Sequence, residues 1–393
     1  MTSRPLSSAA KPPPSEPRPS SSVLLLSPIN EVLLLHRVHT STSFASAHVF
    51  PGGNLDPYHD GPIPPADSPE RHQDGLAYRI GAIRETFEET GILLTRKNAG
   101  LISLTAEDRD AARKLIHGNQ VKFLDWLKSV GAEPDLDGLI PFTRWITPAL
   151  NTKRFTTQMY LYMLPQSRSN IPSEMHIPTP DNGIEHTAAL FAPAQSFLSR
   201  ASTNSIILFP PQAYLLTLVA NILQNTPGGP LQIASQRERL LSFLERVPTT
   251  EDEDINLSEM MSHVEEFKRM NGEELLQQLM KEDGVGSIEE YIQLQHARLG
   301  SFNEKSNTHK TAMIPWGDKV MSPHNLFIRK DDKRIVLGLD KPGPELKGSD
   351  RGGDWERVVL VNFGKGGPTN VEVRRREDVL DEERKSKVSD EKL

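Results

Sequence analysis

The strongest constraint on how this chain folds is one short segment, Tyr78–Leu94, with the sequence YRIGAIRETFEETGILL. Apolar side chains recur there with the 4-3-4 spacing of a helical face that packs on a core: Leu76, Ile80, Ile83 and Phe87. Glu85, Glu88 and Glu89 stand at positions i, i+3 and i+4, so they share the other side of the same helix. Gly91 follows where a left-handed residue would end the helix. The segment therefore predicts an amphipathic helix that gathers three carboxylates.

Like charges this close destabilise a helix slightly, and a bare E-x-x-E-E pattern is usually an ordinary solvated face. Two neighbouring features favour a functional role here. Arg84 directly precedes the first glutamate and Gly91 closely follows the last, which completes an R-E-x-x-x-E-x-G spacing. Upstream, the apolar stretch AHVF runs into a bend at Gly52–Gly53. The combination indicates a site built on the helix rather than a solvated surface.

Composition limits the class of protein. The chain has 393 residues, 36% of them hydrophobic and 25% charged, which fits a soluble globular protein of one or two domains. The net charge of -7 gives no overall basic surface for nucleic acid or anionic lipid, although local phosphate pockets remain open. The absence of cysteine excludes disulfides, thiolate nucleophiles and cysteine zinc sites. Apolar runs such as Val32–Leu35 are far shorter than the roughly 18–20 residues that span a bilayer.

Composition also divides the chain into five parts. The first is Pro/Ser-rich without the apolar region of a secretory signal, so we expect it to be disordered. The second mixes apolar strands with helices and is expected to form the main domain, with an irregular insertion after the Gly-Gly bend. An acidic helical bridge, a β-rich extension docked on the core and a charged tail follow. The expected boundaries are 1–22, 23–225 with the insertion at 54–75, 226–314, 315–373 and 374–393.

The stretch FPGG…RETFEETGI resembles the Nudix box, the signature of the Nudix hydrolase family, with the pattern G-x5-E-x7-R-E-U-x-E-E-x-G-U, where U is apolar. The second half matches except that Thr86 takes an apolar position. In the first half, thirty residues separate Gly53 from Arg84, many more than the x5-E-x7 of the pattern. The early glutamate has no direct equivalent, and Asp56 and Glu70 are the candidates for it.

Within that family, the chain resembles the coenzyme A and acyl-CoA diphosphatases of animal mitochondria and peroxisomes. The similarity lies in AHVFPGG, in the long insertion, in WITP…RFTT at Trp145–Thr157 and in FPPQ at Phe209–Gln212, and it covers about 23–224. The resemblance implies a Nudix α/β/α sandwich with a mixed sheet, enlarged by the insertion and by an α+β C-terminal extension.

The family's chemistry implies a role for each matched residue. Glu88 and Glu89 would bind a metal directly, and Glu85 would be a further ligand or the base that orients the attacking water. Arg84 would hold one of these carboxylates by a charge-assisted hydrogen bond, and the backbone at Gly53 would approach the metal. The implied cofactor is Mg²⁺ or Mn²⁺. Elementary chemistry agrees, because hard cations prefer carboxylate oxygens and lower the pKa of bound water.

Three residues outside the box are further candidates. Glu185 precedes a predicted strand and could be the additional acid that a later loop often contributes in this family, or an ordinary loop carboxylate. Arg37 and Arg154 adjoin predicted strands and are candidates for binding substrate phosphates, with solvated arginines as the alternative.

The resemblance implies hydrolysis of the diphosphate linkage of CoA or an acyl-CoA to adenosine 3′,5′-bisphosphate and the (acyl-)phosphopantetheine. A second interpretation is hydrolysis of another nucleotide or organic diphosphate, such as a nucleoside diphosphate sugar or an isoprenoid diphosphate. A third is a non-catalytic Nudix module that binds nucleotides, which the intact glutamates disfavour. The expected partner is therefore a small-molecule diphosphate, not nucleic acid.

Targeting signals are weak. The final residues, Glu391–Leu393, approach a peroxisomal address but place glutamate where a small residue is needed. We therefore expect a cytoplasmic protein, with a peroxisomal location as the alternative. A mitochondrial location is a further alternative, because the first part of the chain carries arginines and many serines.

Overall fold

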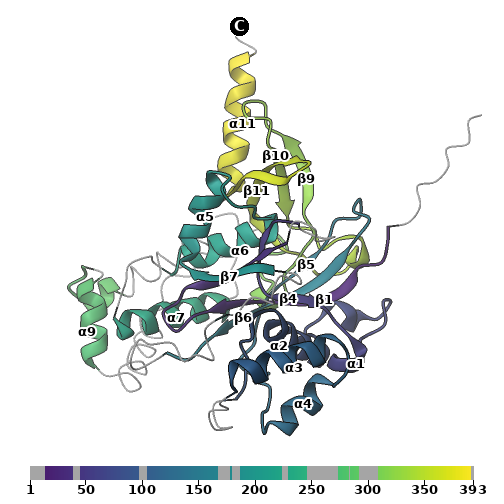
Figure 1. Ribbon diagram of the computed structural model, residues 1–393. Coiled ribbons are helices and arrows are strands. Elements are labelled where there is room, and N and C mark those ends of the chain that lie inside the picture. Colours follow the sequence, from purple (N-terminus) through teal and green to yellow (C-terminus); the bar gives the residue numbers. More distant parts are fainter. Residues whose placement is uncertain are drawn as a thin grey trace, which may run out of the picture.

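The computed structural model describes residues 14–38, 45–96, 104–166, 178, 186–223, 229–245, 273–282, 284–291 and 309–390 (Figure 1). Its centre is an eight-stranded mixed sheet. The path through the sheet is β3-β2-β1-β6-β5-β8, while β4 pairs with β1 and β7 pairs with β2. The strands are β1 (Arg18–Leu26), β2 (Val32–Arg37), β3 (His48–Val49), β4 (Gly52–Asn54), β5 (Ile140–Ile146), β6 (Phe155–Met163), β7 (His186–Ala192) and β8 (Val320–Met321).

The first strand begins earlier than composition suggests. β1 starts at Arg18 and pairs in parallel with β6 along its whole length, so residues 18–22 are not part of a disordered N-terminus. Ser20 and Ser21 are buried, and the Ser20 hydroxyl lies 2.7 Å from that of Thr157. A central strand is held by backbone hydrogen bonds to neighbours on both sides, which a polar sequence provides as well as an apolar one. Residues 1–13 lie outside the described part of the chain.

The glutamate-bearing helix forms as the spacing predicts. It is α2 (Leu76–Thr90), and it ends at Gly91 with a left-handed φ of 72°. Ile83 and Phe87 are fully buried beneath it. Leu76, which the spacing placed on the buried face, is 61% exposed instead, because it is the first residue of the helix and precedes the packed turns.

Alternation along the strands sends side chains to both faces of the sheet. Val23, Leu25, Leu33 and Leu35 join a core cluster with α2. That face also carries α1 (Pro57–Asp60), α3 (Ala106–His117) and α4 (Phe123–Ser129). Leu24, Leu26, Val32 and Leu34 join a second cluster on the opposite face. There the helices are α5 (Ala194–Ser202), α6 (Pro210–Ala220) and α7 (Pro230–Glu245), so the α/β/α sandwich is confirmed (Figure 1).

The expected boundary at 225 is wrong, because α7 belongs to the main core. Leu240 and Phe243 are buried in the same cluster as α6. Arg237 donates from α7 to the backbone oxygens of Ser27 and Leu164, both at 2.8 Å. Of the expected acidic bridge after α7, the structure describes a second helix, α9 (Glu273–Glu282), and short flanking segments.

The C-terminal extension is built into the domain in two ways. β8 follows a short turn, η3 (Trp316–Asp318), and pairs with β5 at the edge of the central sheet. A separate antiparallel sheet has the order β12-β11-β10-β9. Its strands are β9 (His324–Ile328), β10 (Ile335–Leu339), β11 (Asp354–Gly364) and β12 (Gly367–Arg375). Leu337, Leu339, Val359 and Val361 join the cluster of α5 and α6, so the second sheet packs on the sandwich.

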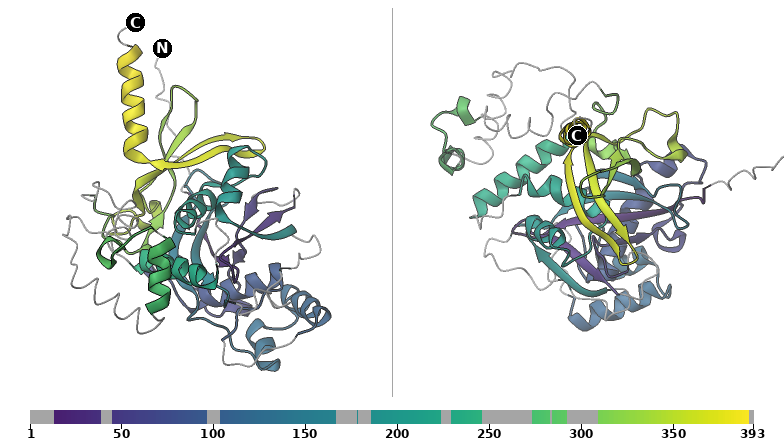
Figure 2. Two further views of the ribbon diagram at one scale, coloured as in Figure 1. Left: turned by 90° about the vertical axis from the view of Figure 1, so that its left-hand side faces the viewer. Right: turned by 90° about the horizontal axis from the view of Figure 1, so that it is seen from above.

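The charged tail is helical. Residues Arg376–Asp390 form α11, which projects from the second sheet away from the central sheet (Figure 2). Val379 packs on the second sheet, in a small cluster with Val358 and Leu360. Among the described residues no helix combines the length and the apolar composition needed to cross a membrane.

A buried hydrogen bond joins the extension to α6. The Tyr214 hydroxyl donates to Asp354 Oδ2 at 2.7 Å, and Arg357 also donates to that oxygen, at 3.0 Å. Because Tyr214 is fully buried, we expect Tyr214→Phe to lower the free energy of unfolding by about 1–2 kcal/mol. Urea unfolding measures this, with Tyr58→Phe, on the surface, as the matched control. An unchanged unfolding free energy would show that this bond does not stabilise the docked extension.

Next to it, Glu356 should make stability depend on pH. Burial, with a smaller contribution from Asp354, raises the pKa of Glu356 from its ordinary 4.5 to about 7. Between these values the folded carboxyl keeps its proton while the unfolded one loses it, so this group's stabilisation falls as the pH rises from 4.5 to 7 and is flat above. Glu356→Gln should remove this decline, worth at most about 3 kcal/mol. Unfolding of both proteins across that range measures it, and parallel pH profiles would contradict it.

Candidate active site

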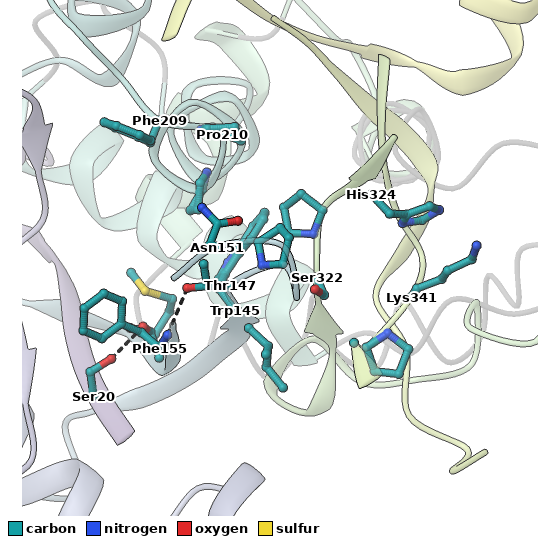
Figure 3. Close-up of a pocket in the computed structure, with 18 of the residues that line it drawn as sticks. Ser20, Trp145, Thr147, Asn151, Phe155, Phe209, Pro210, Ser322, His324 and Lys341 are labelled. Atoms are coloured by element: carbon teal, nitrogen blue, oxygen red, sulfur yellow. Dashed lines mark hydrogen bonds between the residues drawn. The ribbon is translucent and has the colours of Figure 1, made fainter. Parts of the chain in front are cut away.

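One cavity joins the two halves of the fold. Its volume is about 1430 Å³. The sandwich lines one side with Ser20–Ser22, the Gly52–Asn54 bend, part of α2 and the segment Trp145–Asn151. The extension lines the other side with the segments Ser322–Asn325, Asp340–Pro344 and Leu346–Ser349. Figure 3 shows His324 and Lys341 on the extension's side, across from Ser20 and Phe155.

Two of the three glutamates reach this cavity. Glu85 and Glu89 line it, together with the glycine bend. The backbone N–H of Gly52 donates to Glu89 Oε2 at 2.8 Å. A Cβ at Gly53 would lie only 2.5 Å from Glu85 Cδ and 2.6 Å from both carboxylate oxygens. The Gly-Gly bend is therefore required for the backbone to lie directly against the carboxylates.

Arg84 forms hydrogen bonds with several carboxylates of the site. Its side chain is 5% exposed, and Nη1 donates to Glu85 Oε1 and to Glu88 Oε1, both at 2.9 Å. Its Nε and Nη2 donate to the two carboxylate oxygens of Asp60, both at 2.8 Å. Nη2 also reaches the Asn54 backbone oxygen at 3.0 Å. Arg84 thus sets the spacing of the α2 carboxylates and ties them to the inserted segment, which is the geometry of a structural arginine.

Asp60 is the functional residue that the sequence pattern missed. Its side chain is fully buried at the end of α1, where it pairs with Arg84. The two acids proposed for this position lie elsewhere. Asp56 caps α1 by accepting from the Tyr58 N–H, and Glu70 is exposed in the short turn η1 (Pro69–His72), beside Ser68. The available signal was spacing, since Asp60 lies only one residue beyond the glutamate position of the box.

The site holds more negative than positive charge. Asp60, Glu85 and Glu88 share the one guanidinium of Arg84. Burial raises the pKa of Glu85 to about 7; Arg84 opposes this shift, while Glu88 and Asp60 add to it. A cation would relieve this repulsion, and a donor set made only of carboxylate oxygens suits hard divalent metals. The residues present therefore fit a magnesium-type ion.

The carboxylate groups do not converge on a single position. Within the described ranges no three His, Asp or Glu side chains surround a common metal position. The Oε1 of Glu88 accepts from Arg84, and its Oε2 lies 3.2 Å from His117 Nδ1. Glu88 accordingly does not line the cavity, whereas Glu85 and Glu89 do.

The other candidate residues are dispersed. Arg37, at the end of β2, lines the cavity. Arg154 does not: it is buried, pairs with Glu345 and donates to the backbone oxygens of Thr147 and Ser15, which is a structural role. Glu185 lies outside the described residues.

Comparison with known proteins agrees with this geometry. Residues 66–219 match the family model described as the NUDT19 Nudix domain. The chain is 30% identical over 239 residues to the acyl-coenzyme A diphosphatase NUDT19 of Gallus gallus, an alignment that covers 49% of this chain and 61% of that protein. The human protein of that name is 28% identical over 254 residues, or 53% of this chain and 64% of that one.

A putative nudix hydrolase 7 of Caenorhabditis elegans is 29% identical over 205 residues, which cover 52% of this chain and 60% of that protein. The matched part thus spans less than two thirds of each of these relatives. Among solved structures, a NUDIX hydrolase from Alicyclobacillus acidocaldarius is 23% identical with a TM-score of 0.43, covering 56% of this chain and 96% of that one. On the family model, residues 66–219 are similar to a Nudix domain, and the chain resembles these Nudix proteins over about half of its length.

Proposed function

We propose that this protein is a metal-dependent hydrolase of a diphosphate linkage, with CoA or an acyl-CoA as its substrate and adenosine 3′,5′-bisphosphate and the (acyl-)phosphopantetheine as products. The observation that carries the proposal is the acidic end of the cavity. There Glu85 and Glu89 lie against the Gly52–Gly53 bend, and Arg84 holds the surrounding carboxylates in place.

Each residue at this end has a definite task. Glu85 and Glu89 would hold a Mg²⁺ or Mn²⁺ ion, with Glu88 beside them on the same helical face. Such an ion neutralises phosphate oxygens and lowers the pKa of bound water. The Gly52 N–H orients the Glu89 carboxylate, and Arg84 keeps Glu85 and Glu88 at hydrogen-bonding distance from its Nη1. Because the bend carries no side chains, the substrate phosphates can approach the protein backbone there.

The choice of substrate rests on the relatives, two of which are named acyl-coenzyme A diphosphatases. The cavity is also large enough, at about 1430 Å³, for a ligand bigger than a single nucleotide. Other nucleotide or isoprenoid diphosphates are the competing substrates. A purely binding role is disfavoured, because Glu85, Glu88, their arginine and its buried partner Asp60 form one network.

The proposal is tested by incubating the full chain with Mg²⁺ or Mn²⁺ and a panel of diphosphates, followed by chromatographic separation of the products. The panel contains CoA, an acyl-CoA, a nucleoside diphosphate sugar and an isoprenoid diphosphate. We expect adenosine 3′,5′-bisphosphate to form from CoA or acyl-CoA and its formation to stop with a chelator. Hydrolysis of another panel member alone would reassign the substrate, and no hydrolysis of any member would contradict an enzymatic role.

A further inference from the structure

Charged side chains are unevenly distributed around the cavity. The sandwich lines it with Glu85 and Glu89 at the acidic end and with one cation, Arg37, at the end of β2. On the opposite side, the lining residues from the extension include three that are cationic at neutral pH, Lys341, Lys347 and Arg351. A fourth cation, Lys310, lies shortly before the extension and also lines the cavity. The extension's one lining carboxylate is Asp340, and the buried Arg376 already donates to it. The extension therefore presents an excess of positive charge across from the proposed metal end.

Three of these cations are available to a ligand. Lys310, Lys341 and Lys347 are exposed, and within the described residues none has a carboxylate at ion-pair distance. Arg351 differs, because its Nε and Nη2 donate to the Asp318 backbone oxygen at 3.2 and 3.0 Å. We call the three lysines the lysine wall. Like charges on one side of a cleft focus the field and favour an anion there.

The lysine wall is held at a set place relative to the glutamates. Lys341 and Lys347 lie in the connection between β10 and β11, and this connection is held at two points. The Ser322 N–H donates to the Lys341 backbone oxygen at 2.7 Å, next to β8 in the central sheet. Within the connection, Glu345 pairs with Arg154, which stands directly before β6. A ligand that spans the cavity would therefore meet both ends at once.

We propose that the lysine wall binds a phosphomonoester of the substrate, separate from the diphosphate at the acidic end. This inference rests on the proposed function and narrows its substrate class to diphosphates that carry a further phosphate. A phosphomonoester has a charge of about −1.5 to −2 at neutral pH. Two or three ammonium groups balance this charge, whereas they would exceed the single charge of a carboxylate. Lysine is suited to this task because it binds phosphate as a point charge.

The test compares two substrates that differ only in that phosphate, CoA and dephospho-CoA. In the double variant Lys341→Met/Lys347→Met, the ratio of kcat/KM for CoA to that for dephospho-CoA should fall about tenfold or more, chiefly through a higher KM for CoA. The matched control is Lys365→Met, an exposed lysine in the β11–β12 turn that does not line the cavity, and it should leave the ratio unchanged. A ratio unchanged in the double variant would overturn the lysine wall while leaving the proposed function intact.

A second measurement keeps the two proposals separable. Isothermal titration without metal should show that adenosine 3′,5′-bisphosphate binds more tightly than adenosine 5′-monophosphate and that the double variant loses this difference. If the wild-type protein hydrolyses neither CoA nor dephospho-CoA, the proposed function fails, and this titration still decides the lysine wall. Equal binding of the two nucleotides by the wild-type protein would refute it.

Discussion

Glu85→Gln is expected to lower kcat on the diphosphate substrate by on the order of a hundredfold or more. The substitution removes one negative charge from the acidic end of the cavity, where a divalent cation needs it. The amide keeps the size of the side chain, and its oxygen can still accept from Arg84 Nη1. Because the ionised Glu85 carboxylate is disfavoured by burial, folding should be unaffected or slightly favoured.

The measurement is steady-state turnover over a range of Mg²⁺ and Mn²⁺ concentrations, with urea unfolding of the same samples. Glu70→Gln is the matched control. Glu70 is an exposed acid of the insertion, and it does not line the cavity. It should retain normal activity. Near-normal turnover in Glu85→Gln at every metal concentration would remove this carboxylate from the metal site.

Arg84→Met should cause the largest loss of stability, about 3–5 kcal/mol in the free energy of unfolding. Asp60 has a side chain with no exposed surface, and the Arg84 guanidinium is its ion-pair partner. Removing the guanidinium leaves that carboxylate buried without its counter-charge, next to Glu85 and Glu88, which also lose their shared donor. Activity should be lost as well, because the spacing of the α2 carboxylates depends on the same side chain.

A double-mutant cycle makes this prediction specific. Arg84→Met combined with Asp60→Asn should cost less than the sum of the two single changes, because the second substitution removes the orphaned charge. Arg96→Met serves as the control, since its ion pair with Asp137 joins two half-exposed or exposed side chains and should contribute at most about 1 kcal/mol. If Arg84→Met costs no more than Arg96→Met, the buried network does not stabilise the fold.

The local parts of the site could be predicted from sequence because short-range geometry determines them. A helix places residues i, i+3 and i+4 on one side, so the positions of Glu85, Glu88 and Glu89 relative to one another follow from spacing alone. Gly91 ends the helix with a φ of 72°, a conformation that glycine adopts without strain. The Gly52–Gly53 bend is similarly local, and the structure shows why no side chain fits there.

Contacts between distant segments could not be predicted in this way. Asp60 reaches Arg84 only because the insertion folds back over α2, and spacing alone does not show that it, rather than Asp56, makes this contact. Likewise, Ser20 and Ser21 look like part of a polar tail, yet they are buried because β1 pairs with β6, more than a hundred residues away. Backbone pairing of this kind depends on the partner strand and not on the side chains of the segment itself.

The sequence by itself therefore determined the glutamate-bearing helix, its bend and their charge, since each is encoded by residues within a few positions of one another. Only the tertiary structure decided which carboxylates face the cavity and what stands opposite them. Glu88 is turned to Arg84 and His117, while the docking of the extension brings Lys341 into the same cavity as Glu85. Such arrangements arise when apolar surfaces from distant parts of the chain are buried together, and local spacing shows that a face is buried but not which distant segment covers it.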